Sequence, residues 1–153
     1  ERELMNSEDI PAIRRGMDTC LKITVLEPDP QNLFRRQAEQ AKLLLDQAMG
    51  EIERNAIEKA EALVKDGNRR DAYKHYVRAL QSNPGNMTIK KTVDDINAEV
   101  AEECKKIFRE GLVYEETGQP DLAITAYEKV LRIAVEGDTY YDRAKEKLRL
   151  LKK

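Results

Sequence analysis

Tryptophan is absent from this 153-residue chain, and histidine, cysteine and phenylalanine are rare. The single histidine, His75, has no cysteine or serine placed near it as a nucleophile. Acid–base and nucleophilic catalysis both need partner groups within reach. Glycine-rich phosphate loops and the spacings typical of metal ligands are also missing. The sequence therefore predicts no enzymatic activity, no cofactor and no metal site.

Two cysteines, Cys20 and Cys104, occur without a CxxC motif or a Cys/His cluster. We expect both to be small buried core residues, which favours a reducing, cytoplasmic compartment. No apolar run approaches the ~18–20 residues of a membrane span, so we expect no membrane insertion, and no signal peptide is visible. Because the chain starts at Glu1 without methionine, we expect it to be a fragment of a longer protein, whose membrane association stays open.

Glycine and proline are few, with seven and five residues, whereas charged residues make up 37% of the chain and apolar residues 41%. Helix-forming residues dominate, so the predicted fold class is all-α. The 27 basic and 29 acidic residues are interspersed and leave a net charge of −2. Nucleic acids and anionic membranes need clustered basic surface, so neither is expected as the main ligand.

Small and aromatic residues alternate in the segment 67–86, which starts with a Gly-Asn turn and ends just after an Asn-Pro pair. Ala72, Tyr76 and Ala79 lie on one stripe of a predicted helix, where alanines let a neighbouring helix approach and the tyrosine fills the groove. The same pattern returns at a spacing of 51 residues. The matching pairs are Gly67 with Gly118, Ala72 with Ala123, and Tyr76 with Tyr127.

These motifs resemble the tetratricopeptide repeat (TPR), with one repeat at about 53–86 and another at about 104–137. The resemblance implies an α-solenoid of antiparallel helix pairs. It also implies a non-enzymatic scaffold for protein–protein interaction.

A spacing of 51 residues is too long for contiguous repeats, and the extra segment 87–103 contains no glycine or proline. Apolar residues recur every three or four positions from Ile89 to Tyr114, which predicts one continuous helix from about Thr88 to Thr117. A second long helix is expected between Asn32 and Gly67. It begins with a heptad seam: Phe34, Ala38, Ala41, Leu45, Ala48 and Ile52.

We therefore expect one TPR-like helical domain, residues 1–153, with unusually long first helices. Its parts are a degenerate repeat half (1–30), two extended repeats (31–86 and 87–137) and a C-terminal capping helix (138–153) that begins after an N-cap at Asp138.

In TPR proteins the first helices of successive repeats line a concave groove, and the resemblance implies that this groove binds a partner helix or peptide. We expect Phe108, with Ile57 and Val64 alongside, to anchor that partner. The implied partner-binding residues are Arg54, Ile57, Glu61, Val64 and Lys65 in one repeat, and Lys105, Phe108, Leu112, Glu115 and Glu116 in the other.

Two alternatives stay open from the sequence. The chain's own long helices or ends could cover the groove. The chain could also be a self-assembly module, a homo-oligomer in which the seams Phe34–Ile52 and Ile89–Val100 pair between copies.

Overall fold

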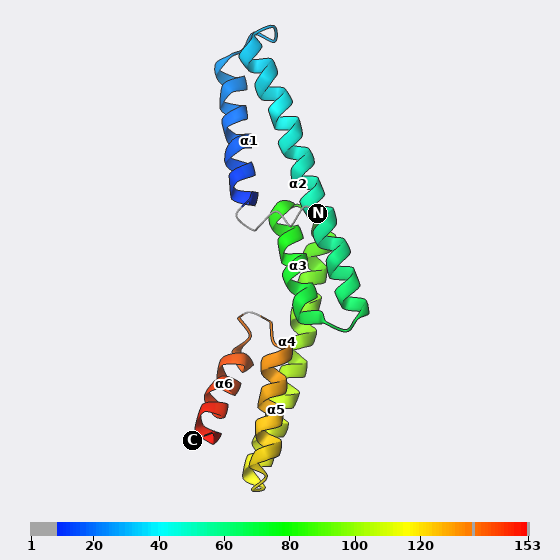
Figure 1. Ribbon diagram of the computed structural model, residues 1–153, viewed down its shortest axis with the longest axis vertical. Helices are drawn as coiled ribbons and strands as arrows, with labels where there is room; N and C mark the ends of the chain where they lie inside the picture. The colour runs from blue at the N-terminus through cyan, green and yellow to red at the C-terminus, as the bar shows by residue number, and fades with distance from the viewer. Residues whose placement is uncertain (1–8, 136, 153) are drawn as a thin grey trace.

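The computed structural model describes residues 9–135 and 137–152, and this part of the chain is helical throughout, with short turns (Figure 1). Residues 1–8 of the predicted degenerate repeat half lie outside the described residues. The helices are α1 (Asp9–Leu26), α2 (Leu33–Lys65), α3 (Arg69–Ser82), α4 (Met87–Glu116), α5 (Pro120–Ile133) and α6 (Thr139–Leu151). The predicted long helices are confirmed, because α2 has 33 residues and α4 has 30.

Each long helix packs mainly against two short ones, and the molecule is elongated as a result (Figure 1). The first half of α2 pairs with α1, and its second half pairs with α3. Helix α4 repeats this arrangement, with α3 along its first half and α5 along its second. The fold is thus an α-solenoid of antiparallel helix pairs in which the long helices join neighbouring pairs.

In space, the short helices α1, α3 and α5 are arranged end to end in one row. At the first junction the Arg14 Nη2 donates to the Gln81 carbonyl oxygen at 2.5 Å. At the second junction the Arg70 Nη1 donates to the Leu131 carbonyl oxygen at 3.0 Å. Both contacts use the free carbonyls at a helix C-terminus, where a cation is favoured by the helix dipole.

The first helix of each predicted repeat ends in the same way. Gly67 and Gly118 have φ angles of +76° and +71°, a left-handed conformation that favours glycine. The amides of Asn68 and Gln119 then donate to carbonyls five residues back, at 2.8 Å in both turns. This is the Schellman arrangement, which satisfies the last carbonyls of a helix. Two such ends at a spacing of 51 residues support the repeat assignment.

Asparagine and aspartate cap the starts of most helices. The Asn68 and Asn86 side chains accept from the Asp71 and Ile89 amides, at 3.2 and 3.1 Å. The predicted N-cap at Asp138 is confirmed, since one of its carboxylate oxygens accepts from the Tyr140 amide at 2.7 Å.

The core runs as a continuous seam along the second half of α2 and along α3, α4, α5 and α6. The predicted stripes are buried, and Ala72, Ala79, Ala123 and Tyr127 have no exposed surface. The residues Ile89, Val93, Ile96 and Val100 of the first half of α4 belong to the same cluster as the α3 stripe. Both cysteines are buried as expected.

Helix α6 closes the C-terminal end of this seam. It packs against α5 and, less extensively, against α4, with Ala144 and Leu148 as its buried residues. It therefore covers the last described repeat in the manner of a capping helix.

Replacing Ala98 with proline is expected to destabilise the protein by about 3 kcal/mol or more. Ala98 is an exposed position in the middle of α4, so the cost arises from the lost backbone hydrogen bond and the clash of the proline ring, and not from packing. Urea denaturation of Ala98→Pro and of the control Ala98→Ser would measure the difference. Equal stabilities would contradict a continuous helix at this position.

Candidate interaction surfaces

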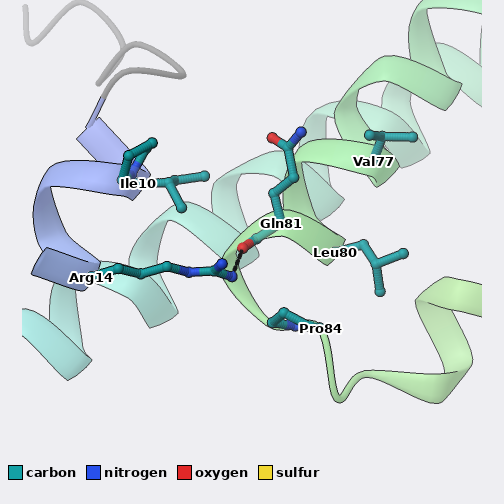
Figure 2. A pocket seen from close by; sticks show the side chains of 7 residues that line it. Ile10, Arg14, Val77, Leu80, Gln81 and Pro84 are labelled. Atoms are coloured by element: carbon teal, nitrogen blue, oxygen red, sulfur yellow. Dashed lines mark hydrogen bonds between the residues drawn. The ribbon is translucent and has the colours of Figure 1, made fainter. Parts of the chain in front are cut away.

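An apolar cleft lies where the N-terminal end of α1 meets the C-terminal end of α3 (Figure 2). Its volume is about 580 Å³. Figure 2 shows the Arg14 side chain reaching across it to the Gln81 backbone. The lining residues are Ile10, Pro11, Arg14, Val77, Leu80, Gln81 and Pro84.

Sequence reasoning missed this cleft. Its two walls come from segments about 70 residues apart, and neither carries a motif that predicts the other. The prolines Pro11 and Pro84 marked a helix start and a turn, but not a shared surface.

Phe108, the expected anchor of the groove, belongs to the core. Only 2% of its surface is exposed, and its ring centroid lies 5.2 Å from that of Tyr127 and 5.5 Å from that of Tyr140. The guanidinium carbon of Arg143 sits 4.7 Å from the centre of the same ring, within cation–π range. The prediction that Phe108 faces solvent was wrong, because α6 packs over this face of α4.

Glu115, another expected groove residue, makes its contacts within the chain. Its carboxylate accepts from the Tyr127 hydroxyl and from the Lys147 ammonium, the latter at 2.9 Å. Burial by itself raises the pKa of Glu115, but the two hydrogen bonds outweigh this and lower it overall. Burial and the neighbouring carboxylate raise the pKa of Tyr127. Glu115 therefore holds α4, α5 and α6 together and is not a free groove residue.

The other expected groove residues of α4 differ in accessibility. Leu112 is half-buried against the core, Lys105 is half-buried and pairs with Glu102 at 2.9 Å, and Glu116 is exposed. Helix α6 thus closes the centre of this half of the groove, around Phe108, Leu112 and Glu115.

The α2 half of the expected groove is open. Arg54, Glu61, Val64 and Lys65 are exposed, and Ile57 is half-buried against the core. Helices α2 and α4 share no extensive contact, because α3 lies along both of them. The two sets of residues are therefore not brought together as neighbouring walls of one groove.

Residues 102–134, which comprise the second half of α4, the turn after it and the whole of α5, match the tetratricopeptide repeat family. This segment is similar to a single tetratricopeptide repeat. No curated protein and no solved structure gives a significant match to the chain. TPRs generally mediate protein–protein interaction and are typically non-enzymatic, which agrees with the implied function class.

The helix pair 53–86 lies outside the matched segment but shares the architecture of the TPR. Its tyrosine, Tyr76, is 6% exposed where Tyr127 is fully buried, and the same Schellman turn joins its helices. One difference lies three residues after the tyrosine, where this helix pair has Ala79 and the matched segment has Val130.

The matched segment contains one buried thiol, Cys104, beside the Asp138 carboxylate. Burial, reinforced by Asp138, raises the pKa of Cys104 to about 12, so the thiolate that a nucleophile requires is suppressed. Burial and nearby cations lower the pKa of His75. Among the described residues, no group of three metal-ligating side chains comes together and no helix could cross a membrane.

Proposed function

We propose that the chain is a non-enzymatic protein–protein interaction scaffold that binds a partner helix or peptide in the α1/α3 cleft. The observation that carries the proposal is the cleft itself, because it is apolar, open to solvent and formed at the junction of two helix pairs of a repeat array. Repeat arrays bind extended chains along such surfaces.

The chemistry of the cleft fits the side chain of one apolar anchor residue. Val77, Leu80 and Pro84 form an apolar wall, and the volume of about 580 Å³ lies in the range of ligand sites, ~300–1,000 Å³. The Arg14 guanidinium lies at the cleft and donates a hydrogen bond to the Gln81 carbonyl oxygen, which holds its orientation. A partner with a leucine or phenylalanine next to a carboxylate would satisfy both the apolar wall and the cation.

The open face of α2 extends this proposal. Arg54, Glu61, Val64 and Lys65 offer mixed charge around an apolar side chain, which suits the polar flank of an amphipathic helix. Self-assembly through the heptad seams has less support, since Ile52 packs against α1, and Ile89 to Val100 pack in the core with α3, within one chain.

Filling the cleft should abolish partner binding. Peptides selected from a random display library against the protein would serve as ligands, and Gln81→Trp places an indole in the cleft at an exposed position. We expect at least about a tenfold loss of affinity by fluorescence anisotropy, roughly 1.4 kcal/mol or more.

The matched control is Gln31→Trp, another exposed glutamine, in the turn between α1 and α2. It should leave affinity unchanged. Equal affinities of both variants for every selected peptide would contradict the cleft as the docking site, provided that both melt at the temperature of the unaltered protein.

A further inference from the structure

A second cleft lies where the N-terminal end of α3 meets the C-terminal end of α5, and its volume is about 350 Å³. Its walls are Arg70 and Lys74 of α3, the turn that follows α5, and Asp138 and Asp142 at the start of α6. We call it the α3/α5 cleft. It stands at the second junction in the row of short helices, as the α1/α3 cleft stands at the first.

The two clefts are built alike. In each of them an arginine near the start of one short helix donates to a carbonyl oxygen near the end of the next, Arg14 to Gln81 and Arg70 to Leu131. Both arginines line their clefts, and neither forms an ion pair with a carboxylate of the described residues. A guanidinium carries five donors in a rigid fork, so the bond to a backbone carbonyl fixes the direction of those that remain. Each cleft therefore presents a preorganised cation.

One side of α3 joins the two clefts. Arg70 and Lys74 line the α3/α5 cleft, whereas Val77 and Gln81 line the α1/α3 cleft. These four residues follow one another at spacings of four, three and four, which places them on the same side of the helix. The rise between Arg70 and Gln81 is about 16 Å, at 1.5 Å per residue. A segment that lies along this side of α3 therefore reaches both clefts.

Charges of opposite sign line the α3/α5 cleft on different walls. The cations Arg70 and Lys74 belong to α3, and the carboxylates Asp138 and Asp142 belong to the start of α6. Asp138 is buried as the N-cap of α6, whereas Asp142 is exposed. Lys74 pairs with Asp71 of its own helix at 2.8 Å, and among the described residues no ion pair joins the cations of α3 to the carboxylates of α6. The opposite charges thus stand apart, with the cleft between them.

This arrangement selects a ligand that carries both signs of charge. A group with a single charge is attracted by one wall and repelled by the other, and like charges held close together are costly at an interface. A nucleic acid would bring negative charge alone, which Asp138 and Asp142 oppose. A protein segment with an acidic and a basic side chain next to each other matches both walls.

We propose that one partner segment occupies both clefts. Its apolar anchor fills the α1/α3 cleft, and an acidic and a basic residue about 16 Å away enter the α3/α5 cleft, the carboxylate on Arg70 and the cation on Asp142. This distance corresponds to about five residues in an extended segment, or about eleven in a helix. The inference rests on the proposed function and adds to it a second contact and the charge pattern of the partner.

Peptides selected from a random display library against the unaltered protein test the second contact. We expect those that Gln81→Trp releases to share an acidic–basic pair at this distance from their apolar residue. Arg70→Glu should weaken their binding at least about tenfold by fluorescence anisotropy. The matched control is Arg69→Glu, which makes the same change of charge one residue away, on a side chain that pairs with Glu103 of α4 at 3.6 Å. It should bind the peptides like the unaltered protein.

Two further measurements separate binding from the structural role of Arg70 at the junction. A peptide whose acidic residue is replaced by lysine should bind Arg70→Glu more tightly than the original peptide does, and the unaltered protein less tightly. Asp142→Lys should also weaken the original peptides at least about tenfold, because it removes the negative wall at an exposed position. Its matched control is Asp121→Lys, an exposed acid in the first turn of α5 and outside the cleft, which should leave binding unchanged.

The outcomes distinguish this inference from the function on which it rests. If Gln81→Trp releases the peptides but Arg70→Glu and Asp142→Lys bind them like the unaltered protein, the proposed function stands and the second contact is overturned. If Gln81→Trp releases no peptide, both are overturned. The second contact is also overturned if Arg69→Glu weakens binding as much as Arg70→Glu, or if the lysine peptide shows no gain on Arg70→Glu.

Discussion

Replacing Tyr127 with alanine is expected to lower the free energy of unfolding by about 3–5 kcal/mol, the usual cost of emptying a large aromatic site in a core. Tyr127 is completely buried and lies against Phe108. Its ring also packs on bare backbone, because a Cβ added at Gly111 would lie 2.6 Å from the Tyr127 Cε1. Neighbouring side chains at this helix crossing are therefore poorly placed to fill the cavity.

The control Tyr127→Phe separates packing from hydrogen bonding. It keeps the ring and removes only the hydroxyl that donates to Glu115, whose carboxylate retains Lys147 as a partner. We expect a loss of about 1–2 kcal/mol for this variant. Urea denaturation would measure both variants. A loss below about 1 kcal/mol for Tyr127→Ala would contradict the central place of this tyrosine in the repeat.

Phe108→Ser is expected to cost about 3–5 kcal/mol and to lower the melting temperature by about 10 °C or more. The substitution removes a ring that touches Tyr127 of α5 and Tyr140 of α6, and it leaves a hydroxyl in an apolar site. It also removes the ring beneath the Arg143 guanidinium. The loss should therefore weaken the docking of α6 as well as the α4–α5 pair.

The matched control is Val113→Ser on the same helix, where the valine is 54% exposed. Differential scanning calorimetry should show little change for this variant. If Phe108→Ser melted like Val113→Ser but weakened the binding of a partner peptide, Phe108 would be a surface anchor after all.

The helices and their ends were predictable because local chemistry determines them. The long helix α4 followed from unbroken three-four spacing, and the helix ends followed from glycine at Gly67 and Gly118 and from N-caps such as Asp138. The repeat itself followed from small and aromatic residues whose spacing is set by the close approach of two helices. Each of these features leaves a signal within a short stretch of sequence.

The surfaces were less predictable because they depend on helices that meet in space. The spacing of Phe108 and Leu112 placed both on one face of α4, but did not reveal that Tyr140 and Arg143 of α6 cover that face. The cleft depends on the contact of Arg14 with Gln81, two residues that no sequence period relates. Which apolar face of a helix stays exposed to solvent thus depends on which other helices pack against it in the folded protein.

The end-to-end row of α1, α3 and α5 has a consequence for the speed of folding. Every extensive contact joins helices that are adjacent or next but one along the chain, so no loop has to close between the two ends. Proteins with such local contacts have a low contact order and cross a small entropic barrier. Folding can therefore begin in any of the helix pairs and spread through α2 or α4 to the next.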